Sequence, residues 1–107
     1  MTLVTDAGTP CVSDPGARAV KAVGEAGFRV IPVPGASAVV TALSGAGLDG
    51  SGFTFVGFVP PQSKARRNAL AYWLARPEPF VLYEAPHRVV DLLEDLAAAM
   101  EPERRVV

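Results

Sequence analysis

The densest group of residues able to bind a small polar ligand lies in residues 5–16. The stretch mixes short hydrogen-bonding side chains with residues that shape turns: Asp6, Thr9, Ser13, Gly8 and Pro10. An apolar run precedes it and an amphipathic run follows it. This order places the stretch on a loop that leads from the carboxyl end of a strand into a helix, where ligands bind in open α/β sheets. The alternative is an ordinary strand-to-helix connection with common turn residues.

A second polar loop, Pro-Gly-Ala-Ser at residues 34–37, follows the next predicted strand. Because the two loops follow successive strands, we expect them to lie side by side and to hold a nucleotide-like ligand together. No lysine follows their glycines, so neither is a phosphate-binding P-loop. Residues 45–50 match the pattern G-x-G-x-x-G, but they follow a predicted helix and precede a strand. They therefore predict a helix stop and a linker, not a dinucleotide site.

Basic residues occupy the starts of two predicted helices. Lys64, Arg66 and Arg67 lie in the first turn of one helix, and His87 and Arg88 repeat the arrangement at the next. Positive charge there opposes the helix dipole, so its placement is favoured where an anion binds. The group predicts a local patch that contacts a polyphosphate backbone. A solvated helix face is the alternative.

Candidates for acid–base chemistry are few. Glu84 and His87 lie close together in the sequence, and a histidine side chain can accept a proton near neutral pH. Cys11 is interpreted as a small hydrophobic residue beside the first loop. The histidine, cysteine and carboxylate residues do not have metal-ligand spacing, so no metal site is predicted.

Composition limits the class of protein. The chain has 107 residues, half of them hydrophobic, and a net charge of -1. It therefore has enough apolar residues for a core but no overall attraction to nucleic acid or acidic membranes. A single cysteine excludes an internal disulfide and fits a reducing cytoplasm. The sequence shows no apolar run of membrane-spanning length and no signal peptide, so no membrane partner is predicted.

Strands and helices are predicted to alternate. Strands are expected at residues 2–5, 28–33, 53–58 and 80–84, with another opening at 105–107; helices are expected at 15–26, 38–46, 63–75 and 85–100. Asp14, Ser37 and Ser63 are predicted N-caps, and Gly27 is a predicted helix stop. The alternation predicts an α/β fold with some parallel pairing. Residues 1–48 and 53–107 are predicted to be parts of two α/β domains, joined by a linker at 49–52.

Six motifs occur together in a specific order and spacing: Thr5-Asp6-Ala7-Gly8-Thr9-Pro10, Ser13-Asp14-Pro15-Gly16, Val33-Pro34-Gly35-Ala36-Ser37-Ala38, Gly57-Phe58-Val59-Pro60, Ser63-Lys64-Ala65-Arg66-Arg67 and Tyr83-Glu84-Ala85-Pro86-His87-Arg88. The set resembles the bacterial ribosomal RNA small-subunit methyltransferase I group, within the tetrapyrrole methylase superfamily. The resemblance spans nearly the whole chain. The last motif favours the ribosomal branch of the superfamily over the precorrin branch.

The resemblance implies methyl transfer from S-adenosylmethionine to a cytidine ribose 2′-hydroxyl of small-subunit rRNA. It also implies a cytoplasmic homodimer with the cofactor folded between two α/β domains. The residues it assigns to the cofactor are Asp6, Ala7, Gly8, Thr9, Val12, Gly35, Ser37, Ala38 and Tyr83. Lys64, Arg66, Arg67, His87 and Arg88 are the candidates for RNA contact. Glu84 or His87 is the candidate base that removes the hydroxyl proton.

Two departures from the family pattern generate further expectations. Family members open with a first strand and a glycine-containing loop, and they close with later strands of the second domain; neither has a counterpart here. We therefore expect a central portion of a larger methyltransferase, which binds the cofactor weakly by itself. A tetrapyrrole or other small-molecule substrate is the second hypothesis, and a non-catalytic α/β fragment is the third.

Overall fold

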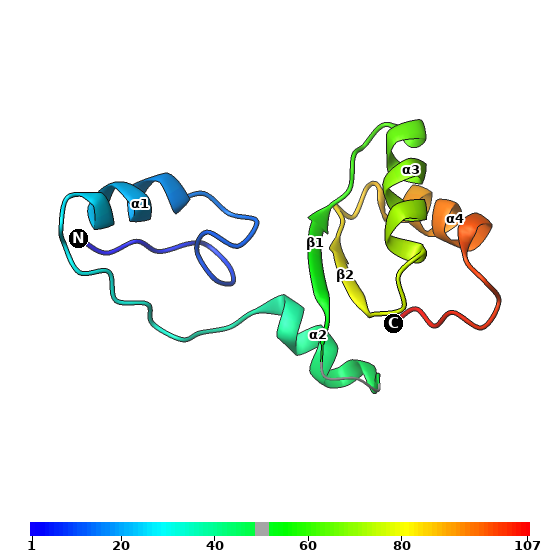
Figure 1. The fold of residues 1–107 in the computed structure, drawn as a ribbon, viewed down its shortest axis with the longest axis horizontal. Coiled ribbons are helices and arrows are strands. Elements are labelled where there is room, and N and C mark those ends of the chain that lie inside the picture. The colour runs from blue at the N-terminus through cyan, green and yellow to red at the C-terminus, as the bar shows by residue number, and fades with distance from the viewer. Residues whose placement is uncertain (49–51) are drawn as a thin grey trace. The chain divides into compact units, whose positions relative to one another are not determined.

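A computed structural model describes residues 1–48 and 52–107. Its elements in chain order are α1 (Ala17–Glu25), α2 (Ala38–Ala46), β1 (Thr54–Phe58), α3 (Ser63–Leu74), β2 (Phe80–Tyr83) and α4 (Val89–Ala99) (Figure 1). The chain divides into two compact units, Met1–Gly45 and Ala46–Val107. The predicted linker at 49–52 lies mostly outside the described residues and stays a prediction. No helix in the described ranges is long and apolar enough to cross a membrane.

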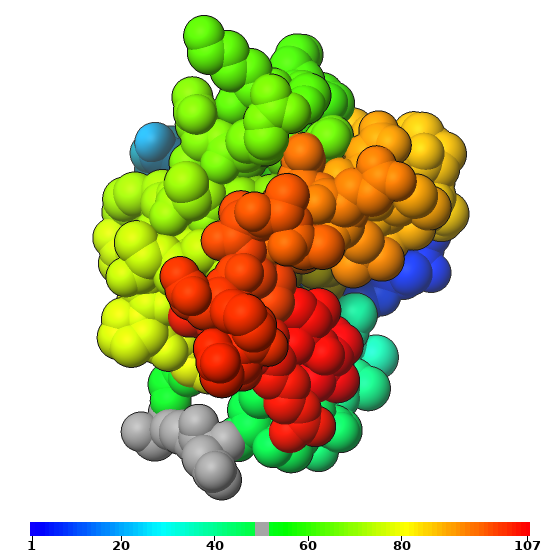
Figure 2. Space-filling view, turned by 90° about the vertical axis from the view of Figure 1, so that its right-hand side faces the viewer, coloured from blue at the N-terminus to red at the C-terminus, as the bar shows by residue number. Residues whose placement is uncertain are grey.

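The second unit confirms the predicted α/β class. Its strands β1 and β2 pair in parallel, and α3 connects them as the crossover that parallel strands require. Helices α3 and α4 both lie on one face of this small sheet (Figure 1). Figure 2 views the outer side of this layer, where α4, in orange, lies beside the C-terminal segment, in red. The order strand, helix, strand, helix over residues 54–99 is as the sequence predicts.

A bulge interrupts the regular alternation of β1. The register with β2 shifts between Phe55 and Gly57, and Gly57 has φ of 76°, which glycine adopts without a steric penalty. The extra residue turns two aromatic side chains three positions apart toward the same partner. The Tyr83 ring lies 4.9 Å from the Phe55 ring and 5.8 Å from the Phe58 ring, edge-on in both cases. This cluster fixes the carboxyl ends of the two strands against each other.

The core of the second unit lies between the sheet and the two helices. Leu70 of α3 is fully buried, and it packs in one cluster with Val59, Leu92 and Leu96. Leu74, Leu82 and Met100 pack against this cluster from its margin. The buried leucines of α4 are four residues apart, as expected for one face of a helix.

The predicted strands at 2–5 and 28–33 are wrong: neither segment is a strand in the structure. A strand needs a neighbour for its backbone hydrogen bonds, and within the described residues the only ladder is that between β1 and β2. Apolar side chains in both segments face solvent, among them Val4 at 78%, Phe28 at 70% and Val33 at 85% exposure. The strand predicted to open at 105–107 is likewise absent.

Helix ends agree with the sequence at two places. Helix α1 ends in a Schellman arrangement, because Gly27 N–H bonds the Gly24 carbonyl and Phe28 N–H bonds the Val23 carbonyl. Gly27 is therefore the helix stop that the sequence predicts. Helix α2 occupies Ala38–Ala46, directly after Ser37, as predicted.

Other helix starts differ from the prediction. Asp14 does not cap α1; the N-cap is Gly16, whose φ of 127° lies outside the helical region and delays the first turn to Ala17. Ser63 is the first residue of α3, and Gln62 is its N-cap. Helix α4 begins four residues later than predicted, because residues 85–88 form a separate turn, closed by a 2.9 Å hydrogen bond from Arg88 N–H to the Ala85 carbonyl.

The burial of Leu70 predicts a large effect of truncation. Leu70→Ala removes a fully buried side chain from the centre of the cluster, so the free energy of unfolding should fall by about 2–5 kcal/mol. Leu93→Ala is the matched control, since Leu93 is 49% exposed and should change that free energy by less than about 1 kcal/mol. Urea denaturation of the intact protein measures both. Equal effects of the two substitutions would contradict the assignment of the core.

Candidate functional site

The two polar loops of the first unit are joined by one hydrogen bond. The Thr9 hydroxyl donates to the Ala36 carbonyl at 3.0 Å, across 27 positions of sequence. This bond brings the loop after residue 5 into contact with the loop before α2. The loops therefore adjoin, although the strands that were predicted to carry them are absent.

Most residues that the sequence assigns to the cofactor are accessible on these loops. Ser37 is half-buried, and the exposed ones are Asp6, Ala7, Gly8, Thr9, Val12, Gly35 and Ala38. Gly8 has φ of 75°, and a Cβ built there or at Gly35 would meet no atom within 4 Å. A ligand can therefore approach the backbone of both loops closely. The residues fit a small polar ligand, with the Asp6 carboxylate and the Ser37 hydroxyl as hydrogen-bonding groups.

The first loop also holds two residues in an unfavourable backbone conformation. Cys11 has φ of 71° and Ser13 has φ of 52°, both in the left-handed region that non-glycine residues rarely adopt. Such residues persist only where surrounding contacts hold them, and they concentrate at binding sites. Sequence reasoning missed both, because neither residue type signals a positive φ.

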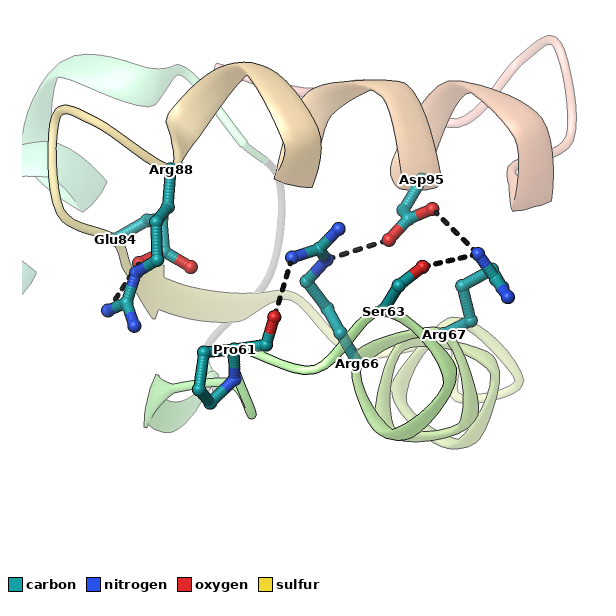
Figure 3. Close-up of polar contacts among 7 residues, drawn as sticks. All are labelled: Pro61, Ser63, Arg66, Arg67, Glu84, Arg88 and Asp95. Carbon is teal, nitrogen blue, oxygen red and sulfur yellow. Dashed lines mark hydrogen bonds and ion pairs between the residues drawn. The ribbon is translucent and has the colours of Figure 1, made fainter.

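In the second unit, a buried arginine connects α3 to α4. Arg66 is 5% exposed, and its Nε donates to Asp95 Oδ2 at 2.7 Å (Figure 3). Its Nη1 also donates to the Pro61 carbonyl at 3.3 Å, which ties the loop after β1 to the same pair. The RNA contact predicted for Arg66 does not fit this arrangement, because its charge is already paired and shielded from solvent.

The other basic residues at the start of α3 remain accessible. Arg67 has a side chain that is 57% exposed, and it approaches the second Asp95 oxygen at 3.7 Å. It also donates to the Ser63 hydroxyl (Figure 3). Lys64 is exposed on the same turn. Both side chains are therefore accessible from solvent, and their contact with RNA stays a prediction.

The turn after β2 contains a buried ion pair. Glu84 Oε1 accepts hydrogen bonds from the Ala85 N–H and from Arg88 Nε, each at 2.8 Å, and Arg88 Nη2 lies at the same distance (Figure 3). The Glu84 side chain is 3% exposed and that of Arg88 is 28% exposed. His87 lies exposed on the same turn. Arg88 is thus mainly engaged with Glu84, which sequence reasoning did not anticipate.

Tyr83, the last residue of β2, is half-buried between Phe55 and Phe58. It faces Phe58 in the strand register, so it lies at the carboxyl edge of the parallel pair. Glu84 follows directly. This edge is where ligands bind in parallel α/β sheets. The sequence predicts Tyr83 and Glu84 at the end of a strand, and the structure places them there; their contact with a ligand stays a prediction. Gly57 was the signal in the sequence for the bulge that brings the aromatic rings together.

The parallel sheet, its crossover helix and the ordered motifs define the class of protein. The chain belongs to the family of tetrapyrrole (corrin/porphyrin) methylases, which matches residues 2–107.

Individual relatives are similar over nearly the whole chain. A protein of Neisseria meningitidis serogroup B, named ribosomal RNA small subunit methyltransferase I, is 54% identical over 104 residues, which cover 97% of this chain and 35% of the relative. Proteins of the same name from Escherichia coli O157:H7 and Micromonospora olivasterospora are 48% and 50% identical, over 100% and 94% of this chain and 37% and 32% of their own lengths. The chain thus spans about a third of the length of these relatives.

The buried Arg66–Asp95 pair predicts unequal roles for two adjacent arginines. Arg66→Met should lower the free energy of unfolding by about 3–5 kcal/mol, since it leaves the Asp95 carboxylate, only 14% exposed, without its main partner. Arg67→Met should change it by less than about 1 kcal/mol, because Arg67 is largely exposed. Urea denaturation measures both variants. A double variant, Arg66→Met with Asp95→Leu, should recover part of the loss. Equal effects of Arg66→Met and Arg67→Met, together with no recovery in the double variant, would refute the structural role of the pair.

Proposed function

We propose that the chain serves S-adenosylmethionine-dependent methyl transfer to a cytidine ribose 2′-hydroxyl in small-subunit rRNA. The observation that carries this proposal is the 54% identity, over 97% of the chain, to a protein named ribosomal RNA small subunit methyltransferase I. The family resemblance extends the proposal to rRNA or the ribosomal subunit as partner, to a homodimer and to a cytoplasmic location.

The joined loops of the first unit support a cofactor role. When bound, S-adenosylmethionine supplies an activated methyl group on a sulfonium. The protein's task is then mainly to align the two reacting groups. We assign Asp6 and Ser37 as the residues that form hydrogen bonds with the hydroxyl and amine groups of the cofactor. The Thr9–Ala36 hydrogen bond holds the two loops that carry them next to each other. By resemblance, Tyr83 of the second unit contributes as well.

The start of α3 supports an RNA role. Lys64 and Arg67 are exposed and adjacent to one another on the first turn, where they can neutralise phosphates. His87 is exposed on the turn before α4 and extends the assignment to that turn. We assign Arg66 and Arg88 structural roles instead of RNA contacts, since each is bound to a carboxylate of its own unit.

Transfer also requires loss of the hydroxyl proton. As the ribose oxygen bonds to the methyl carbon, the carbon–sulfur bond breaks and its electron pair stays on sulfur. The hydroxyl proton passes to a base, for which Glu84 and His87 are the candidates. Their positions at the carboxyl edge of the sheet support this assignment.

The reaction itself is tested on small ribosomal subunits from a strain that lacks the protein. Incubation with the intact protein and methyl-labelled S-adenosylmethionine should place label in 2′-O-methylcytidine, detected by nuclease digestion and mass spectrometry. Label in a base-methylated nucleoside would contradict the ribose assignment. Absence of transfer to subunits and to free rRNA would overturn the proposed function.

The cofactor assignment predicts that Asp6→Ala and Ser37→Ala each weaken S-adenosylmethionine binding about fivefold or more, since each removes a hydrogen bond to the ligand. Ser44→Ala is the matched control, because Ser44 bonds the Thr41 carbonyl within α2 and has no assigned ligand. Calorimetric titration of the intact protein measures all three variants. Unchanged affinity in both loop variants would count against the assignment.

The RNA assignment predicts a change in salt dependence. Lys64→Gln should lower the slope of log affinity against log salt concentration by about 0.7–0.9, because one phosphate contact is lost. Lys21→Gln should leave the slope unchanged, since Lys21 lies on α1 and faces Glu25 at 3.7 Å. Fluorescence anisotropy with an rRNA fragment measures the slope at several salt concentrations. Equal slopes for all three proteins would exclude a phosphate contact by Lys64.

A further inference from the structure

The two oxygens of the Glu84 carboxylate differ in their hydrogen bonding. Its Oε1 atom accepts hydrogen bonds from the Ala85 N–H and from Arg88 Nε, and Arg88 Nη2 forms an ion pair with the same oxygen, each contact at 2.8 Å. Its Oε2 atom is buried and has no hydrogen-bond partner among the residues that the structure describes. A buried carboxylate oxygen without a donor is strongly unfavourable, so each such atom calls for an explanation.

The position of this oxygen indicates what could satisfy it. Glu84 directly follows β2, and β1 and β2 end together at the Phe58–Tyr83 pair. The oxygen therefore belongs to the carboxyl edge of a parallel sheet, where ligands bind in α/β proteins. An ionised carboxylate can only accept hydrogen bonds, so the missing partner is a donor.

We propose that Glu84 Oε2 accepts a hydrogen bond from a hydroxyl or amine of a bound reactant, and that Arg88 is the positioning residue that holds the carboxylate by Oε1. The inference deepens the proposed function and rests on it. The same donor chemistry is present in the amine and hydroxyls of S-adenosylmethionine and in the ribose hydroxyls of RNA. Arg88, in this assignment, orients an acceptor and does not bind phosphate.

The different roles of Oε1 and Oε2 follow from the geometry of the turn. The guanidinium of Arg88 places two nitrogens at 2.8 Å from one oxygen, one of them as a hydrogen-bond donor, and the Ala85 N–H donates to the same oxygen. These contacts fix the rotation of the carboxylate. They leave Oε2 as the carboxylate oxygen without a hydrogen-bond partner among the described residues.

The decisive variant is Glu84→Gln. The amide oxygen can replace Oε1, because the Ala85 N–H and Arg88 require an acceptor there, and the amide nitrogen then takes the place of Oε2. An acceptor becomes a donor at the ligand position while the shape of the side chain is kept. Binding of S-adenosylmethionine, by calorimetry, or of an rRNA fragment, by anisotropy, should weaken about tenfold or more. The affected ligand identifies the source of the donor.

Three further variants separate this role from stability. Arg88→Met removes the ion pair but keeps Oε2, so it should weaken ligand binding less than Glu84→Gln, although it should lower thermal stability more because it leaves the buried carboxylate without its cation. Glu84→Asp keeps the charge but shortens the side chain and withdraws the oxygen, so it should also weaken binding. It provides the test if Glu84→Gln does not fold. Glu78→Gln is the matched control, since the Arg76–Glu78 pair is about 40% exposed at the other end of β2.

The outcomes distinguish the two proposals. Wild-type methyl transfer with unchanged affinities for both ligands in Glu84→Gln and Glu84→Asp would overturn the role of Oε2 and leave the proposed function standing. A loss in Arg88→Met as large as that in Glu84→Gln would reduce Glu84 to a structural ion pair. Failure of the wild-type protein to bind either ligand would overturn both proposals.

Discussion

The second unit depends on the buried contact between Arg66 and Asp95. One guanidinium joins α3 to α4 and reaches the Pro61 carbonyl in the loop that leaves β1. The two helices and the loop at the carboxyl edge are thus fixed by a single charged group. A charge that is only 5% exposed is tolerated there because its partners are close and include a carboxylate. Around it, the leucines supply apolar burial but little orientation, since hydrophobic contact is not directional.

The constraint at Arg66 has a counterpart at Arg88. Both arginines lie beside a helix start, and both are bound to a carboxylate of the same unit. Arg66 holds two helices together, whereas Arg88 holds the end of β2 against the start of α4. Lys64 and Arg67 differ from these two arginines because their side chains are exposed, which leaves them accessible to solvent and to anions. Basic residues in one sequence motif therefore divide into internal and external groups.

The predictability of the fold differs between the two units for a physical reason. β1, α3 and β2 are specified by local patterns whose partners lie within the described chain, so their bounds agree with the sequence to within a residue or two. The segments at 2–5 and 28–33 have strand-like composition, yet Val4 and Phe28 remain exposed because no described segment pairs with them. Strand propensity measures how well a residue suits a pleated, half-buried surface, and it cannot create that surface.

The candidate site shows the same limit at the level of single atoms. Sequence reasoning placed Asp6 and Ser37 on polar loops and Glu84 at a strand end, because these positions follow from the order of elements. It assigned Arg66 and Arg88 to a ligand because residue type reports charge and not the partner of that charge. The distinction arises from packing: Asp95 lies 29 residues after Arg66, and only the docking of α4 on α3 brings the two together. The environment of Glu84 depends on the same kind of contact, since the turn at 85–88 supplies donors to one carboxylate oxygen and leaves the other without a partner among the described residues.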